Sequence, residues 1–374
     1  KLREYSLRGG TLLFVPCHNS GAFLKSAKEG LEKLYTEQRK IAGGHYSLET
    51  LPADHPLYSV HYKIANGPKS AMMWGVSDGT RLLAVISGRD FPCAWHRRAE
   101  VSGRIDHMLG VNFFLYATGA NSLRMRMRPV FFSKGREVRH HAKIAWLKHN
   151  GNSQTQPYAL KYLSEKLTAE NRVAINVTAG APIRADKLRG YHLAWMTGSG
   201  EFSLTADELS ALRDYLNSGG TLFVNAVGGS GPFNRSALDM LAKLLAGMNA
   251  VSGNVTPTSP LITGKCGDFR GPPIKSLPRT QVWRKSQKQA PSPLRVFIRN
   301  KRAVVIYAPY GVHDTLDGHT AHGAFSYMPP AARDIAANIV LYSLIEKPAP
   351  PPLKKVEKPT TTTAPAEKQK GMFD

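Results

Sequence analysis

A duplicated segment is the feature of this sequence that most constrains its fold. Residues 2–34 align without a gap on residues 212–244 and agree at fifteen of thirty-three positions. Both segments begin with Leu-Arg-x-Tyr and continue with Gly-Gly-Thr-Leu and then Ser-Gly-x-Phe. Looser matches follow downstream, such as Thr80–Ser87 against Lys301–Ala308. This self-similarity predicts two copies of one domain.

The second copy predicts an α/β fold. Short apolar runs suited to buried strands alternate with segments of helical spacing between residues 141 and 346. Thr205 and Glu208 have the spacing of a helix capping box, and Ser236 predicts the start of a later helix, as Ser26 does in the first copy. Continuous apolar strands between helices predict a doubly wound, mostly parallel sheet that is covered on both faces.

The chain divides into four segments. Residues 1–120 begin at the helix before the Gly-Gly turn and lack a counterpart of residues 143–211, so we expect a domain without its opening strands. Such a half sheet has an unpaired edge, which favours association unless something covers it. We interpret residues 121–140 as a basic linker, residues 141–346 as the complete second copy, and residues 347–374 as a disordered tail rich in Pro, Thr and Lys.

The cellular compartment of the protein has to be inferred from its first residues, its apolar runs and its cysteines. Lys1 is not a start methionine and no signal-peptide pattern is present, so we expect that the beginning was lost by processing or truncation. No run of eighteen apolar residues occurs, and we expect no transmembrane segment. Cys17, Cys93 and Cys266 are too far apart to suggest a zinc or disulfide framework, and they are predicted to be buried thiols.

The net charge of +23 is concentrated in two segments. Residues 121–150 hold eight Lys or Arg against one acid, and residues 261–300 hold nine against one. Basic segments attract anionic partners, and Arg124, Arg126 and Arg128 are candidates to contact one. The alternative is a solvated surface that keeps the protein soluble. No aromatic motif typical of RNA recognition occurs, so nucleic acid is the less expected partner.

Residues 196–233, MTGSGEFSLTADELSALRDYLNSGGTLFVNAVGGSGPF, resemble the bacterial family called domain of unknown function 4159. The resemblance extends over the second copy and, in part, over the first. It implies two tandem flavodoxin-like domains similar to class I glutamine amidotransferases, an exported, periplasmic or membrane-associated location, and no established activity. Asn225 stands where the family usually has an acid, which argues against a metal role at this position.

Loops after the strands are the first places to look for a site, because open α/β sheets bind ligands at the carboxyl ends of their strands. In amidotransferases a cysteine on such a turn attacks the amide, and Cys17 lies in about that place. Its counterpart is Val227, and the glycines that usually flank the nucleophile are missing. We therefore expect a packed strand-end thiol, with a catalytic Cys17 as the alternative.

The equivalent loop of the second copy could direct backbone amides at an anion. Its candidate ligand-binding residues are Asn225, Gly228, Gly229, Ser230 and Gly231. Ser20 and Gly21 repeat the last two of these in the first copy. The alternative is therefore a turn that the fold itself requires.

The sequence HDTLDGHTAH contains the densest cluster of metal-ligand residue types. Its nitrogen and oxygen donors are His313, Asp314, Asp317, His319 and His322. These residue types could bind a divalent metal, but their spacing matches no known motif, and a polar loop is the default interpretation.

Together these patterns predict a noncatalytic, exported interaction protein that binds an anionic partner or surface and needs no cofactor. The alternative is a hydrolase or amide-processing enzyme that uses Cys17 or a metal bound in the loop of residues 313–322.

Overall fold

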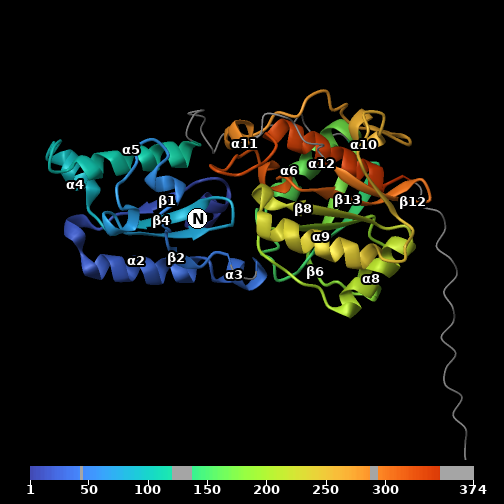
Figure 1. Ribbon diagram of the computed structural model, residues 1–374, viewed down its shortest axis with the longest axis horizontal. Coiled ribbons are helices and arrows are strands. Elements are labelled where there is room, and N and C mark those ends of the chain that lie inside the picture. The colour runs from blue at the N-terminus through green and yellow to red at the C-terminus, as the bar shows by residue number, and fades with distance from the viewer. Residues whose placement is uncertain (43–44, 120–136, 287–293, 346–374) are drawn as a thin grey trace, which may run out of the picture.

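The computed structural model describes residues 1–42, 45–119, 137–286 and 294–345 (Figure 1). The tail and most of the predicted linker lie outside these ranges. The first half contains β1 (Leu12–Phe14), β2 (Leu48–Thr50), β3 (Met73–Ser77) and β4 (Leu82–Ser87), with α1 (Leu2–Leu7), η1 (Cys17–Asn19), α2 (Gly21–Leu34), α3 (Thr36–Ala42), η2 (Pro56–Tyr58), η3 (Gly67–Lys69), α4 (Phe91–His96) and α5 (Arg104–Thr118).

The second half is larger. Its strands are β5 (His140–Leu147), β6 (Val173–Ala181), β7 (Leu193–Gly198), β8 (Thr221–Ala226), β9 (Val251–Asn254), β10 (Lys265–Cys266), β11 (Phe269–Arg270), β12 (Arg295–Arg299) and β13 (Arg302–Ala308). Its helices are α6 (Ala159–Asn171), α7 (Ala185–Leu188), α8 (Ala206–Asn217), η4 (Val227–Gly229), α9 (Gly231–Leu245), α10 (Pro260–Thr263), α11 (Gln281–Ser286), η5 (His313–Thr315) and α12 (Pro329–Ser343). The α/β class expected from the sequence is therefore present.

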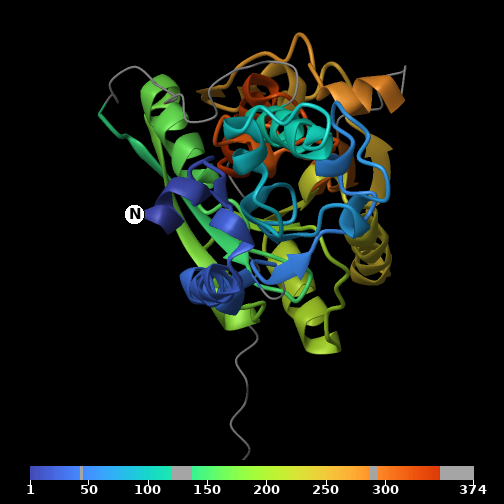
Figure 2. The same cartoon turned by 90° about the vertical axis from the view of Figure 1, so that its left-hand side faces the viewer.

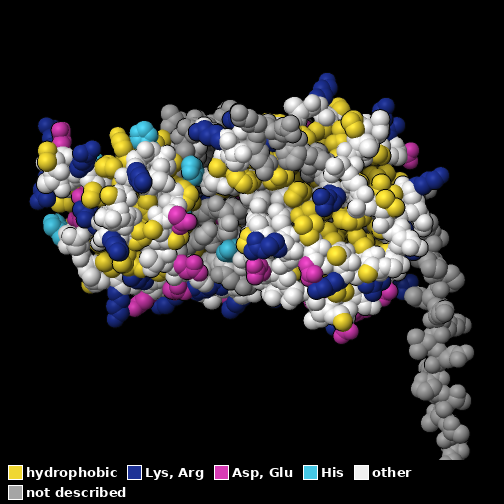
Figure 3. Space-filling model, viewed as in Figure 1, with side chains coloured by type: hydrophobic (Ala, Val, Ile, Leu, Met, Phe, Trp, Pro, Cys, Tyr) yellow, Lys and Arg dark blue, Asp and Glu magenta, His cyan; other side chains and the backbone are white. Residues whose placement is uncertain are grey.

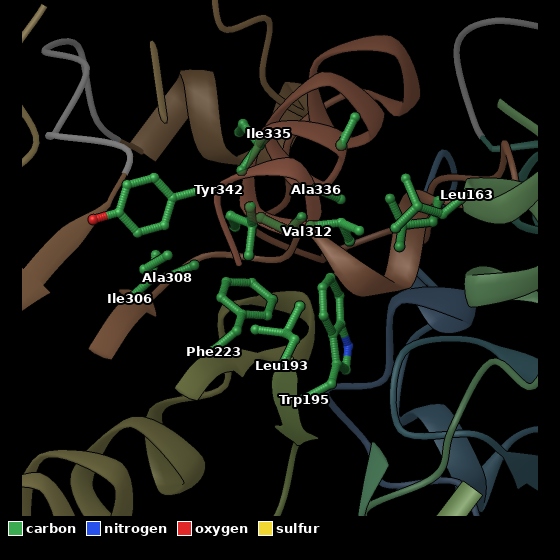
Figure 4. Packing of buried hydrophobic residues seen from close by; sticks show 14 of the residues in the cluster. Leu163, Leu193, Trp195, Phe223, Ile306, Ala308, Val312, Ile335, Ala336 and Tyr342 are labelled. Carbon is green, nitrogen blue, oxygen red and sulfur yellow. The ribbon is translucent and has the colours of Figure 1, made fainter. Parts of the chain in front are cut away.

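The second half is built on a seven-stranded sheet of order β6-β5-β7-β8-β13-β12-β9. The first five strands in this order are parallel, and β12 pairs antiparallel with both β13 and β9. Helices α6 and α12 cover one face and α8 and α9 the other, so the central strands β7, β8 and β13 are buried on both sides, as predicted. Figure 4 shows Trp195, Phe223 and Ile335 packed in one of these cores. Burying each such side chain contributes about 1.5–3 kcal/mol.

The first half has a four-stranded sheet of order β1-β4-β3-β2. Helices α2 and α5 lie on opposite sides of it (Figure 1 and Figure 2). The pairing of β1 with β4 is the only parallel one in this sheet, because β3 pairs antiparallel with both β4 and β2. The prediction of a mostly parallel sheet was therefore wrong for this half. The order and directions match β8-β13-β12-β9, which is the part of the larger sheet that turns antiparallel.

The duplicated segments have the same local structure, a helix, a Gly-Gly turn, a strand, a short 3-10 turn and a long helix. The second glycine of each pair lies under a tyrosine ring. A Cβ at Gly10 would lie 2.2 Å from Tyr5, and one at Gly220 would lie 2.3 Å from Tyr215. Both copies therefore need glycine here, because any side chain would collide with the ring that closes the turn.

The long helices begin earlier than predicted. The capping box of Thr205 is present, but Ser26 and Ser236 lie inside α2 and α9 and do not start them. The caps are Ser20 and Ser230, whose hydroxyls accept the backbone N–H three residues on at 3.3 and 3.4 Å. A serine before Gly at the strand end satisfies the first free N–H groups and leaves no role for a later cap.

The edge of the first sheet is open along α1, β1 and α2. Leu2, Tyr5 and Phe23 are 56%, 44% and 38% exposed. Their counterparts Leu212, Tyr215 and Phe233 are 0%, 4% and 0% exposed. Strand β7 and the residues that follow it make the difference, because they pair with β8 and pack on Phe233. The predicted unpaired edge is thus found in the part of the chain that the structure describes.

The two halves contact each other through polar side chains near their facing loops. His45 Nε2 lies 2.6 Å from Ser199 Oγ, and Gln156 donates to Thr80 Oγ1 at 3.2 Å. The Arg8 guanidinium lies 5.3 Å from the centre of the Tyr158 ring. These contacts place the segments that follow β5 and β7 next to the first half.

Candidate functional site

The turn after β1 carries side chains that the equivalent turn after β8 lacks. His18 and Asn19 have φ angles of +51° and +53°, and their counterparts Gly228 and Gly229 have +62° and +74°. The left-handed conformation costs about 1–2 kcal/mol for a residue with a side chain and almost nothing for glycine. The first half therefore keeps His18 at a position where glycine would fit at lower cost, whereas Asn19 is of a type that adopts this conformation more readily.

Three ligand-type side chains meet at this turn. Cys17 Sγ lies 3.0 Å from His18 Nδ1, and Asp90 Oδ2 accepts the backbone N–H of His18 at 2.6 Å. One donor atom from each of the three lies within 4.8 Å of the others. Asp90 is fixed further, because its Oδ1 accepts the N–H of Cys93 and its own N–H donates to Asn19 Oδ1. The cluster is thus held by backbone contacts from two strand ends, those of β1 and β4.

A cleft of about 600 Å³ opens beside this cluster. Its lining includes His18, Asn19, Asp90, Cys93, Arg97 and Asp106. Arg89 anchors one wall through two hydrogen bonds to Asp106, of 2.8 and 2.9 Å, and this contact raises the pKa of the Arg89 guanidinium. The side chains at the turn therefore border a space that could admit a small ligand.

The cysteines differ from one another. Cys17 is exposed, so the prediction of a packed strand-end thiol was wrong. The physical reason is the short β1 with its open edge, which leaves the residues after it without a neighbouring strand. Cys93 is half-buried, and Cys266 is buried as predicted. Burial raises the pKa of the Cys266 thiol to about 12.

The turn after β8 is closed by neighbouring protein groups. The carbonyl of Gly228 accepts the N–H of Phe325 at 2.9 Å, and a Cβ at Gly229 would lie 2.8 Å from Phe325 Cβ. Ser230 donates its hydroxyl to the carbonyl of Ser199 and caps α9. The loop that ends at Gly231 thus has a structural role in the fold. Anion binding by it stays a prediction.

Asn225 is fully buried at the end of β8. Its Nδ2 donates to the carbonyls of Ala308 and Tyr310 at 3.1 and 2.8 Å. Its Oδ1 accepts the N–H groups of Val312 and His313 at 3.2 and 3.0 Å. The amide thus joins β8 to the chain after β13. Only a side chain that both donates and accepts can make this set of bonds.

Two residues of the predicted metal loop are engaged inside the protein. His313 Nδ1 accepts the indole N–H of Trp195 at 3.2 Å, and Nε2 lies 3.1 Å from the carbonyl of Thr155. Burial lowers the pKa of His313 to about 4. Asp314 accepts the hydroxyl of Ser326, and burial raises its pKa to about 6. Both side chains therefore have hydrogen-bond partners within the fold.

The other three loop residues point to different places. Asp317 accepts the N–H of His319, whose Nε2 lies 3.0 Å from the carbonyl of Arg8. His322 lies near the ring of Tyr116, with 6.0 Å between ring centres. The five predicted ligands do not converge. Among the residues that the structure describes, only the turn after β1 brings three such donors together.

Comparison with known protein families shows which family the chain belongs to. The family model described as a domain of unknown function (DUF4159) matches residues 1–118 and 143–344. The chain belongs to this family. No curated protein matches it. The description of this family gives no activity. The resemblance noted at residues 196–233 is confirmed by the match of this DUF4159 protein.

The basic segments of this DUF4159 protein are described in part. Arg124, Arg126 and Arg128 lie between the two matched stretches and outside the described residues. In the second segment, the exposed bases around β10, β11 and α11 are Lys265, Arg270, Lys275, Arg284 and Lys285. The only acid in residues 261–286 is Asp268. Figure 3 shows Lys and Arg side chains near α11. No helix in the described ranges has the length and apolarity to cross a bilayer.

Proposed function

We propose that this DUF4159 protein is a noncatalytic, exported interaction protein that binds an anionic partner or surface. In this proposal the chain consists of two copies of an amidotransferase-like, flavodoxin-like domain, and the first copy lacks the opening strands. The shared strand order and the shared Gly-Gly turn support a duplication. The second copy serves mainly as a scaffold, since the groups at its strand ends are used by the fold itself.

The observation that carries this proposal is the second basic segment, whose exposed bases are Lys265, Arg270, Lys275, Arg284 and Lys285. All five side chains are exposed on one stretch of chain with a single acid. Like charges gathered without neutralising acids repel one another, so their position favours an anionic partner that relieves the repulsion. On α2, by contrast, Lys25 and Lys33 are accompanied by Glu29 and Glu32.

Retention on heparin tests this function. We expect that replacing Lys275, Arg284 and Lys285 with glutamine lowers the salt concentration at which the protein elutes. A control variant with Lys25, Lys33 and Lys161 changed to glutamine has the same net charge and should elute close to the unmodified protein. Equal shifts in the two variants would show that retention follows net charge alone, and the second basic segment would then have no special role. Vesicles of phosphatidylglycerol provide a second anionic probe.

A second candidate function rests on the contact between Cys17 and His18. An imidazole 3.0 Å from a thiol can accept its proton and produce the thiolate that attacks a carbonyl carbon. The exposed position of Cys17 at a strand end next to a cleft favours access by a substrate. This arrangement supports a hydrolase or amide-processing enzyme as the alternative.

Alkylation by iodoacetamide at neutral pH separates the two functions. If the imidazole activates the thiol, Cys17 should react on the order of ten times faster than Cys93, and Cys266 should react slowest because of its burial and its raised pKa. In the variant His18→Gly the turn is retained, as in the second half, and the rate at Cys17 should fall. A Cys17 rate that is the same with and without His18 argues against the enzyme.

A further inference from the structure

We propose that Cys17, His18 and Asp90 bind a divalent transition-metal ion of the zinc type. The three side chains offer a sulfur, an imidazole nitrogen and a carboxylate oxygen, which is a donor set that zinc accepts. A sulfur ligand selects such an ion over magnesium or calcium, which prefer oxygen ligands. This inference is independent of the anionic partner proposed above.

The distances fit a single ion. Zinc lies about 2.0–2.3 Å from each of its ligand atoms, so two of its ligands are separated by at most about 4.6 Å. The donor atoms of the cluster all lie within 4.8 Å of one another, and Cys17 Sγ is 3.0 Å from His18 Nδ1. Small rotations of exposed side chains are therefore sufficient to bring the three donors around one ion.

The surroundings orient the carboxylate. Asp90 Oδ2 accepts the backbone N–H of His18, and Oδ1 accepts the backbone N–H of Cys93. The side chain of Asn19 accepts the N–H of Asp90 itself and ties the end of β4 to the turn after β1. Partners of this kind hold the ligands of metal sites in position. Asp90 is thus fixed near the turn before any ion arrives.

The second half provides an internal comparison. The counterparts of Cys17 and His18 are Val227 and Gly228, and continuing the alignment of β4 with β13 places Gly311 opposite Asp90. All three donors are therefore absent at the turn after β8, although that turn has the same backbone shape. The fold does not require these side chains. Their joint presence in the first half, at a conformational cost at His18, is accounted for by a ligand.

Three protein ligands leave at least one position on the ion open. The cleft of about 600 Å³ includes His18 and Asp90 in its lining, so the open position would face this space. Zinc sites with three protein ligands keep such a position for water or a substrate, whereas sites with four protein ligands are structural. We therefore infer an ion that can exchange its remaining ligand with small molecules in the cleft.

Metal binding to the full chain, purified without a histidine tag and stripped with a chelator, tests the inference. We expect one Zn²⁺ per chain by titration calorimetry, and a thiolate-to-metal absorption band in the near ultraviolet when Co²⁺ replaces it. The variants Cys17→Ser and His18→Gly should each weaken zinc binding on the order of 100-fold and remove or shift the cobalt band. Titration with Mg²⁺ should show no binding.

Two controls keep this test decisive. His61→Gln removes an exposed imidazole that lies outside the cleft lining and should leave the zinc affinity unchanged. His18→Gly introduces the residue that the second half uses at the same φ, so its unfolding midpoint should be maintained or raised while zinc binding is lost. The proposal is overturned if zinc does not bind, if His18→Gly binds zinc as well as the unmodified protein, or if His61→Gln weakens binding equally.

Discussion

Replacing Phe233 with alanine is expected to lower the free energy of unfolding by about 3–5 kcal/mol. The ring is fully buried and packs against Phe202, with 5.0 Å between ring centres, and against His149 at 5.8 Å. A Cβ at Gly198 would lie 2.7 Å from the ring, so the pocket is closed tightly and cannot collapse without moving backbone. Denaturant unfolding followed by circular dichroism measures the loss.

The matched variant is Phe23→Ala in the first half. Phe23 occupies the same place in the repeat but is 38% exposed, so its loss should cost about 1 kcal/mol or less. The two variants change the same residue type in the same local structure and differ only in what covers the ring. If Phe23→Ala costs as much as Phe233→Ala, then the open edge of the first sheet is covered in solution, and sedimentation would identify self-association as the cause.

The substitution Asn225→Asp should be similarly severe, with a loss of about 3–5 kcal/mol at neutral pH. A carboxylate has no N–H to donate to the carbonyls of Ala308 and Tyr310, and its charge would face both oxygens. Burial and these oxygens would raise the pKa of the new carboxyl above its value in the unfolded chain. The loss should therefore be smallest at low pH and grow as pH rises through the raised pKa.

The control for this prediction is Asn254→Asp, which makes the same chemical change on the exposed strand β9. We expect it to alter the unfolding free energy by less than about 0.5 kcal/mol at any pH. Unfolding curves at pH 5 and pH 7.5 would show the difference. A stability of Asn225→Asp that does not depend on pH would contradict the buried donor role assigned to this amide.

Much of the fold could be predicted from the sequence because duplication and periodicity are local signals. The repeat predicted that residues 2–34 and 212–244 share one structure, and the apolar runs predicted the strands β5 to β8 and β13. The direction of β3 and β2 could not be predicted, because antiparallel pairing depends on how distant strands meet. The positions of the helix caps were missed because Ser26 and Ser236 are each followed by an acid three residues later, as in a capping box, whereas the true caps Ser20 and Ser230 are followed there by phenylalanine.

The candidate site was predicted only in part. Cys17 was identified from its place after a strand, but its exposure follows from the open sheet edge, which a residue pattern does not show. Asp90 comes from a strand end 72 residues away in sequence, so only the parallel pairing of β1 with β4 brings it to the turn. The loop of residues 313–322 looked like a metal site in the sequence because its donor residues are close together. In the structure, His313 and Asp314 of this loop make hydrogen bonds within the protein. The sequence did contain one signal for this site: in the alignment of the two copies, His18 and Asn19 stand where the second copy has Gly228 and Gly229.

The open edge of β1 also affects how readily this strand separates from its sheet. A strand held on one side only can separate from its sheet at a lower free energy than one held on both sides. Strand β8 has neighbours on both sides, whereas β1 has β4 alone. The turn with Cys17 and His18 therefore follows the less firmly held of these two strands, and we expect its amide protons to exchange with solvent ahead of those in the equivalent turn after β8.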